Sequence, residues 1–240
     1  MADPRLTLFV PDPSPISPPF QRALDMLSEP DSWVLYKSTK DFQSYTSNKP
    51  GYRMKSQGII NESVVNLGIT GIEREGAAAN EQMDEMAYLE GSSLTKEAFV
   101  WVSFKGMGPA SKRDFVLRRL VRTLEDGSFL SVTESVERPD CPPRPGYVRA
   151  VVHISVALFR PLPESTPEHP HTEVTLAVWM DLKGSIPFFL VNLGRGQHGK
   201  TIIKIGDHAR EMRSMGWDPA NPAGPSLASL LDRKNQLVAS

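Results

Sequence analysis

Residues 111–136 read SKRDFVLRRLVRTLEDGSFLSVTESV, and the Asp126-Gly127 pair near the middle favours a two-residue hairpin turn. With these two residues forming the turn, Arg119 is predicted to lie directly opposite Glu134. Side chains of a strand alternate between two faces, so one face of this hairpin is predicted to be apolar around a single charge pair. The same register pairs Leu117 with Val136, Val121 with Val132, and Thr123 with Leu130.

Two interpretations of the Arg119 and Glu134 pair remain open at this point. It could be a cross-strand ion pair at a solvated edge, or a polar anchor inside an otherwise apolar cavity. Burying one charge without its partner costs several kcal/mol, so a buried arginine is expected to have a carboxylate beside it. The charges face each other only in this register, which is why the pattern favours it.

Composition indicates an ordinary globular protein. The chain has 240 residues, of which 40% are hydrophobic and 23% charged, and its formal net charge is −1. This balance gives no general attraction to nucleic acid or to anionic membranes. No apolar run is long enough to span a bilayer, and the N-terminus lacks the pattern of a signal peptide. Cys141 is the single cysteine, which fits a reducing compartment, so we expect a cytoplasmic protein.

Hydrophobic periodicity predicts short strands joined by tight turns, with helices at the start, middle and end of the chain. Residues 64–72 fit a helix or a strand, and the pattern does not decide between them. The predicted helices cover residues 20–28, 77–89, 187–215 and 227–238. Besides the hairpin, the predicted strands cover residues 33–38, 41–47, 52–60, 98–105, 147–159 and 172–182.

This order of elements indicates the α+β class with an antiparallel sheet. A curved sheet closed on one side by a long helix encloses a cavity, and the last helix carries a wide apolar stripe suited to that position. Residues 1–19 contain six prolines and are predicted to be an extended or mobile N-terminal extension. The predicted domain covers residues 20–215, and residues 216–240 form a Pro/Gly linker with a short tail.

Three motifs resemble those of the START (steroidogenic acute regulatory protein-related lipid transfer) domain family. Residues 111–119 (SKRDFVLRR) are similar to the family's SxRDFVxxR segment. Residues 135–150 begin with SV, contain PP and end with GYVRA, which resembles the SV…P…GxVRA segment. Residues 181–192 (DLKGSIPFFLVN) match DxxGxIPxxxxN, which leads into the family's C-terminal helix. Order and spacing agree over roughly residues 20–215.

The resemblance implies a helix-grip fold, in which a curved antiparallel β-sheet wraps a long C-terminal helix around a lipid tunnel. It implies one bound sterol, phospholipid or ceramide-like lipid, transfer between membranes, no cofactor and no catalysis. In several members an arginine matching Arg119 pairs in the tunnel with an acid on the preceding strand. Here that strand offers Phe99, Val100 and Trp101, so Glu134 is the expected substitute. Asp114 and Arg149 are expected to form a structural ion pair.

The predicted site is therefore a tunnel with Arg119 and Glu134 at the polar group of one lipid. The last helix and residues 138–146 are the expected gates, and we expect a monomer that touches membranes transiently without binding nucleic acid. The predicted apolar wall consists of Leu117, Val121, Val132, Val136, Trp101, Val178, Phe189 and Ile202.

Two other functions compete with lipid transfer. Residues 194–201 (GRGQHGKT) match the phosphate-loop pattern GxxxxGK[ST], but only 39 residues follow, too few for the parallel βα units of that fold. A cyclase or hydrolase in the same cavity would need an acid–base group, for which Arg119 and Glu134 are the only candidate. The five histidines are scattered without ligand spacing, so no metal site is expected.

Overall fold

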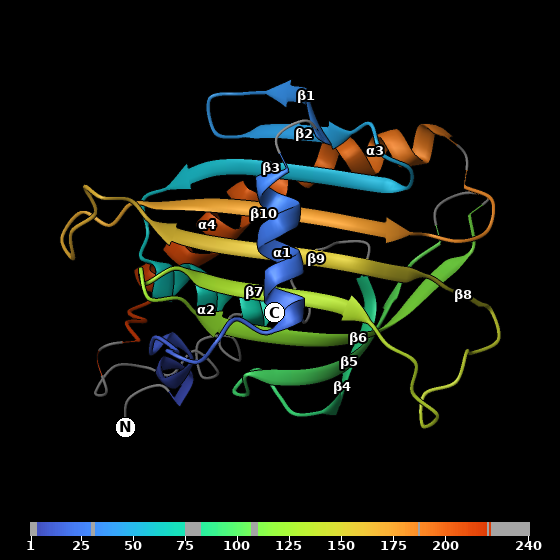
Figure 1. Cartoon of the computed structure of the whole chain (residues 1–240), viewed down its shortest axis with the longest axis horizontal. Helices are drawn as coiled ribbons and strands as arrows, with labels where there is room; N and C mark the ends of the chain where they lie inside the picture. The colour runs from blue at the N-terminus through green and yellow to red at the C-terminus, as the bar shows by residue number, and fades with distance from the viewer. Residues whose placement is uncertain are drawn as a thin grey trace.

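The computed structural model describes residues 4–29, 32–74, 83–106, 110–186, 188–219 and 221, and its main feature is one ten-stranded sheet (Figure 1). The strand order is β1-β2-β3-β10-β9-β7-β6-β5-β4, and all neighbours in this order are antiparallel. The short β8 lies outside this order and pairs in parallel with β6. The strands are β1 (Trp33–Ser38), β2 (Gln43–Ser47), β3 (Tyr52–Ile60), β4 (Met83–Glu90), β5 (Glu97–Phe104), β6 (Lys112–Thr123), β7 (Phe129–Ser135), β8 (Tyr147–Arg149), β9 (Val151–Pro161) and β10 (Thr172–Asp181).

Helices lie on both sides of the sheet (Figure 1). Helix α1 (Pro18–Ser28) crosses one side, the outer face, and packs against β7 and β9. Helices α2 (Val64–Arg74) and α4 (Lys200–Ser214) lie on the other side, the inner face, where they contact each other. Helix α3 (Phe188–His198) contacts β3 on that side, and a 3₁₀ helix, η1 (Pro4–Phe9), contacts α2 and β6. This layering is the α+β arrangement expected from the sequence.

Most predicted elements are present, but three of them differ from the prediction in type or extent. Residues 83–89, predicted as part of a helix, form the edge strand β4, because pairing with β5 outweighs a weak helical stripe; residues 77–82 lie outside the described part. The undecided residues 64–72 are helical. The predicted strand 147–159 divides at Ala150, and the predicted helix 187–215 divides at Gly199. The predicted helix 227–238 lies outside the described residues.

The β6–β7 hairpin exists, but its predicted register is wrong by one residue. The loop has three residues, closed by hydrogen bonds from Leu124 N to Ser128 O (2.8 Å) and from Gly127 N to Leu124 O (3.0 Å). Gly127 has φ +78°, whereas Asp126 does not have the positive φ that a two-residue type I′ turn needs. Since the side-chain period of a strand is two, this shift moves every β7 side chain to the face opposite the predicted one.

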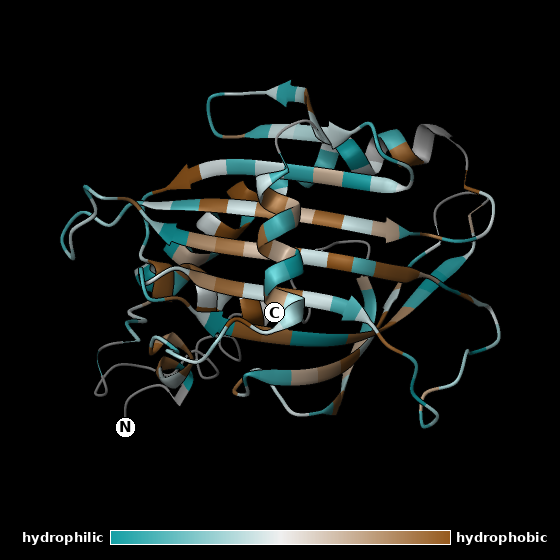
Figure 2. Cartoon of the chain, in the orientation of Figure 1, coloured by the Kyte–Doolittle hydropathy of each residue, from teal (hydrophilic) through white to brown (hydrophobic). Residues whose placement is uncertain are grey.

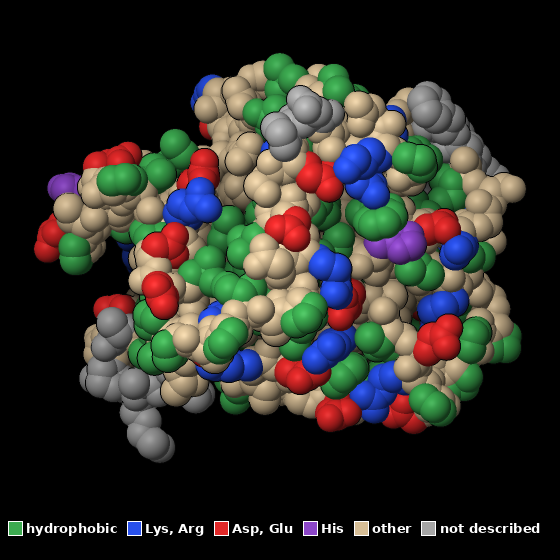
Figure 3. All heavy atoms as spheres, in the orientation of Figure 1, with side chains coloured by type: hydrophobic (Ala, Val, Ile, Leu, Met, Phe, Trp, Pro, Cys, Tyr) green, Lys and Arg blue, Asp and Glu red, His purple; other side chains and the backbone are tan. Residues whose placement is uncertain are grey.

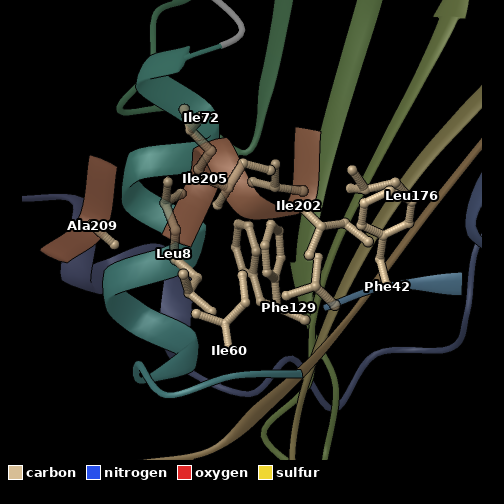
Figure 4. Close-up of a cluster of buried hydrophobic side chains, with 13 residues drawn as sticks. Leu8, Phe42, Ile60, Ile72, Phe129, Leu176, Ile202, Ile205 and Ala209 are labelled. Carbon is tan, nitrogen blue, oxygen red and sulfur yellow. The ribbon is translucent and has the colours of Figure 1, made fainter. Parts of the chain in front are cut away.

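The inner face holds a solid hydrophobic core at one half of its length. Figure 4 shows side chains from α2, α4, η1 and the strands pointing toward one another, with Phe129, Ile202 and Ile205 near the centre. The aromatic ring of Phe9 stacks on that of Phe129 with a centroid distance of 4.4 Å. The buried members are Leu8, Phe42, Ile60, Leu67, Ile72, Val121, Phe129, Phe159, Val174, Leu176, Ile202, Ile205 and Ala209.

A second core lies under α1 on the outer face. Pro18 and Pro19 suit the first turn of a helix, and α1 then buries Phe20, Ala23 and Met26 at a spacing of three residues. The strands beneath alternate between apolar and polar residues, which Figure 2 shows as alternating colours along β7, β9 and β10. The strand side chains in this core are Leu120, Leu130, Val132, Ile154, Val156, Leu158 and Ala177.

Residues 4–17, which belong to the segment 1–19 predicted to be extended or mobile, are packed against the rest of the structure. Leu8 is 3% exposed within the inner core, and its carbonyl accepts a hydrogen bond from Thr123 Oγ1 at 2.8 Å. The buried Arg122 donates to the carbonyls of Asp12, Ser14 and Pro15. These contacts attach residues 4–19 to β6.

The other predicted domain boundary also falls within packed structure. Trp217, two residues beyond the predicted end at residue 215, is 2% exposed and packs with Ile69 and Met212. The folded unit among the described residues therefore extends past both predicted boundaries.

Candidate functional site

The other half of the inner face differs from the solid core. An apolar cluster gathers there from β4, β5, β6, β9 and β10, and among the described residues no helical side chain joins it. Its buried members are Val102, Phe115, Ala150 and Val152, while the half-buried ones are Met83, Phe104, Leu117, Met180 and Leu182. The inner face thus combines a filled half with a half whose apolar side chains keep some accessible surface.

Arg119 lies on the inner face, as predicted, because it shares strand parity with Leu117 and Val121 on β6. The residue is only 1% exposed. Its Nη2 donates to the carbonyl oxygens of Ser92 at 2.7 Å and Thr95 at 3.2 Å, in the turn between β4 and β5. The guanidinium is therefore held against backbone oxygens at the start of the apolar half.

Glu134 is not the partner of Arg119, and that prediction is wrong. In the observed register Arg119 faces Thr133, whereas Glu134 faces Arg118. Glu134 lies on the outer face, where its carboxylate accepts from Arg22 of α1 at 2.7 Å and lies 3.8 Å from Arg118 Nη1. The acid–base pair required by the enzyme alternative is therefore absent.

The predicted wall residues divide between the two faces. Leu117, Val121, Val178 and Ile202 lie on the inner side, but Val121 and Ile202 belong to the solid core, and only Leu117 belongs to the apolar half. The side chain of Phe189 lies outside the described part. Val132, Val136 and Trp101 lie on the outer face, and this correction follows for the β7 residues from the one-residue shift of the hairpin.

The same shift places small polar side chains on the inner side of β7. Ser131, Thr133 and Ser135 occupy the positions where the prediction placed valine and glutamate. Ser135 Oγ accepts a hydrogen bond from the backbone N–H of Val152 at 2.9 Å. The inner face is consequently more polar along β7 than the sequence predicts.

Trp101 belongs to a buried ionic cluster on the outer face. Arg149 binds Asp114 through two hydrogen bonds of 3.0 and 2.9 Å, which confirms the predicted ion pair, and Trp101 Nε1 donates to the same carboxylate at 2.9 Å. The Arg149 guanidinium also donates to the carbonyls of Cys141 and Pro142. Residues 138–146, one of the two predicted gates, are thereby tied to the outer face rather than to the inner one.

A group that the sequence analysis missed lies where α3 ends over β3. His198 Nδ1 hydrogen-bonds Ser56 Oγ at 2.8 Å, and Ser56 Oγ hydrogen-bonds Ser44 Oγ at 2.8 Å. Burial lowers the pKa of His198 to about 4, so the ring is neutral at pH 7, although its side chain keeps accessible surface. A signal was available in the alternation along β3, which puts Ser56 on the same face as Met54.

Tyr52 is the next polar side chain along this face. An added Cβ at Gly194 of α3 would lie 3.3 Å from Tyr52 Oη, so helix and ring are in contact. Burial raises the pKa of Tyr52 to about 12, which keeps the phenol protonated as a hydrogen-bond donor. Tyr52, Ser56 and His198 form the polar group that we call the α3 cluster.

The structure contradicts the phosphate-loop alternative. Gly194 and Gly196 lie within α3, and residues 200–201 begin α4, so the segment does not form the open glycine-rich loop that would surround a phosphate. Among the residues that the structure describes, no three His, Cys, Asp or Glu side chains are grouped to hold a metal ion.

Comparison with known proteins identifies the family. The family model described as "START domain" matches residues 21–197. This chain belongs to the START domain family. StAR-related lipid transfer protein 5 of Bos taurus is 42% identical over 82 residues, and Steroidogenic acute regulatory-like protein 1 of Caenorhabditis elegans is 40% identical over 84 residues. These alignments cover 34% of this chain in both cases, and only 37% and 30% of the two START relatives, respectively.

Solved START structures show the same fold at lower identity. The structure of human StAR-related lipid transfer protein 5 has a TM-score of 0.70 at 20% identity, covering 81% of this chain and 94% of its own. Human STARD10 has a TM-score of 0.69 at 17% identity, covering 84% and 82%. The helix-grip arrangement, an antiparallel sheet with a C-terminal helix, is therefore confirmed for this START domain.

Proposed function

We propose that this START domain binds one lipid on the apolar half of its inner face and carries it between membranes without altering it. Its relative StAR-related lipid transfer protein 5 is named as a lipid transfer protein, and the observation that carries the proposal here is the apolar cluster, which no helical side chain joins among the residues that the structure describes. A sterol-sized ligand would bury a few hundred Å² of apolar surface there, at roughly 25 cal/mol per Å². Burial of this size supplies enough free energy to hold a water-insoluble molecule.

We further propose that the lipid lies between Leu117, Val178 and α3, with Arg119 and the α3 cluster as the two places where its oxygen atoms can be bound. Arg119 would donate to an acceptor oxygen, while neutral His198 and Tyr52 offer weaker donors. Helix α3 would act as the gate, since it contacts β3 on the inner side of the sheet and residues 138–146 are bound to the outer face. Motion of α3 must then precede loading and release.

The function is tested by identifying what the purified protein holds. Native mass spectrometry followed by organic extraction is expected to recover one lipid per chain. Incubation with donor and acceptor vesicles is expected to move that lipid without forming a product. Protein that stays empty after incubation with mixed sterol, phospholipid and ceramide vesicles would contradict the proposal, and so would release of a chemically changed lipid.

Replacement of Arg119 with methionine is expected to lower the affinity for the recovered lipid by about tenfold or more, because a hydrogen bond to a charged group contributes roughly 1.5–3 kcal/mol. Affinity is measured by equilibrium transfer from vesicles, and folding by denaturant unfolding. Arg119→Lys keeps the charge and is the matched control, expected to retain part of the affinity. Unchanged affinity in a folded Arg119→Met variant would remove Arg119 from the binding site.

A further inference from the structure

The free edge of strand β1 is unusual for a protein surface, because three successive large hydrophobic residues are exposed on it. Val34 is 53% exposed, Leu35 55% and Tyr36 42%. Strand β1 lies at the end of the sheet, and among the described residues its outer edge pairs with no other strand. Figure 3 shows apolar side chains reaching the rim over β1 at the top of the view, while basic and acidic side chains intermingle over the lower part. Exposed apolar surface of this kind indicates an interaction site.

The same region is the basic part of a slightly acidic chain. Residues 33–58, which form β1, β2 and most of β3, contain five basic residues and one acidic residue, a formal charge of +4. The whole chain carries −1, which leaves −5 for the rest. Lys49 is paired with Glu29, whereas Lys37 and Lys40 are exposed and make no ion pair with any residue that the structure describes, so their charges are available to a partner. The partner should therefore be both apolar and anionic.

We propose that this edge docks on an anionic lipid bilayer, with Val34, Leu35 and Tyr36 in the interfacial layer and Lys37 and Lys40 at the headgroups. Tyrosine is favoured at membrane interfaces, and lysine beside an apolar segment binds anionic lipid. This inference rests on the proposed function, which requires a membrane contact. The docked edge would lie beside α3, since α3 contacts β3 in the same part of the sheet (Figure 1).

A strand from another protein is the competing occupant, and the edge is poorly built for it. The β1 register shifts between Leu35 and Lys37, so a bulge interrupts the line of backbone groups that a new strand would need. Strand β1 has only six residues and carries a lysine near its end. Bulges, short strands and lysines are the features by which natural sheets prevent edge pairing. The exposed side chains, rather than the backbone, are therefore the binding surface.

Flotation with vesicles tests the charged part of the proposal. Wild-type protein is expected to bind vesicles of phosphatidylcholine and phosphatidylserine (7:3) and to leave phosphatidylcholine vesicles largely unbound. Each lysine is worth about fivefold in binding to an anionic surface, so Lys37→Glu/Lys40→Glu is expected to weaken binding at least about 30-fold. Arg160→Glu/Arg210→Glu makes the same charge change on other exposed surface and should have far less effect. Equal losses in both double variants would overturn the proposal.

An environment-sensitive dye tests the apolar part. A dye on Leu35→Cys is expected to shift to the blue with phosphatidylserine vesicles, whereas a dye on Ile59→Cys, which is 60% exposed at the far end of β3, should not. No shift at residue 35, or a dimer mass in light scattering that Leu35→Glu abolishes, would overturn docking on a bilayer. If extraction recovers a lipid from the protein but both vesicle tests fail, the docking surface on β1 is wrong, while the proposed lipid-binding function still holds.

Discussion

Replacing Asp114 with asparagine is expected to lower the free energy of unfolding by about 3 kcal/mol, because it leaves the half-buried Arg149 without its carboxylate. The Asp114 side chain is fully buried, and it accepts from both Arg149 and Trp101. Glu173→Gln removes a carboxylate from the exposed pair with Arg160, 3.4 Å apart, and is expected to cost less than 1 kcal/mol. Denaturant unfolding at pH 7 measures both values.

Lowering the pH should reduce the difference in unfolding free energy between wild type and Asp114→Asn. Burial alone would raise the pKa of Asp114, but hydrogen bonds from Arg149 and Trp101 outweigh it and hold the pKa below its ordinary 3.8. A carboxyl with a lowered folded-state pKa stabilises the protein above pH 3.8 and loses that contribution as the pH falls through the folded value. The gap between wild type and Asp114→Asn should therefore narrow below about pH 4. A gap that stays constant down to pH 3 would show that the charge of Asp114 is not what stabilises the cluster.

Replacing Gly199 with alanine is expected to destabilise the protein by about 1–3 kcal/mol, although its backbone is helical (φ −67°, ψ −29°). An added Cβ would lie 2.2 Å from the ring of Phe42 and 2.5 Å from Ser44 Oγ. Gly196, three residues earlier in α3, has nothing within 4 Å of an added Cβ. Gly196→Ala is therefore expected to stabilise by about 0.5–1 kcal/mol, the ordinary helical preference for alanine.

Thermal and denaturant unfolding of the two glycine variants give a sharp comparison, because the same substitution is expected to have opposite signs. If both variants gain stability, the contact of the helix junction with β2 is looser than the structure indicates. If both lose stability, the stabilisation expected for Gly196→Ala is wrong.

How far the sequence predicts this fold depends on whether a local signal competes with a distant one. The predicted strands 33–38 and 52–60 have the observed bounds of β1 and β3, whereas the predicted helix 20–28 begins two residues later than α1, because Pro18 and Pro19 were assigned to the extended segment. Residues 64–72 remained undecided because Gly68 and Gly71 weaken a helix. An added Cβ at Gly68 would lie 2.6 Å from the ring of Phe9, a residue 59 positions away. No local pattern contains that contact.

The candidate site was predicted less well than the fold, and one turn explains most of the difference. Asp126-Gly127 suits two kinds of turn, and the observed one puts only Gly127 in the left-handed region. Arg119, Leu117 and Val121 on β6 were placed correctly, whereas Glu134 and the β7 valines were placed on the wrong face. A hairpin register is fixed by the turn, so an error of one residue reverses a whole strand.

The bonds at the end of α3 also determine how that helix could move. His198 is hydrogen-bonded to Ser56, and Gly199 lies against Phe42, so the C-terminal end of α3 is a fixed pivot. The helix has 11 residues and is therefore roughly 16 Å long. A rotation of about 20° around the pivot would move its first turn by about 5 Å, which is close to the spacing between neighbouring strands. A small rotation of α3 about its C-terminal end would thus be enough to open an entrance for a lipid, without any movement of the solid core.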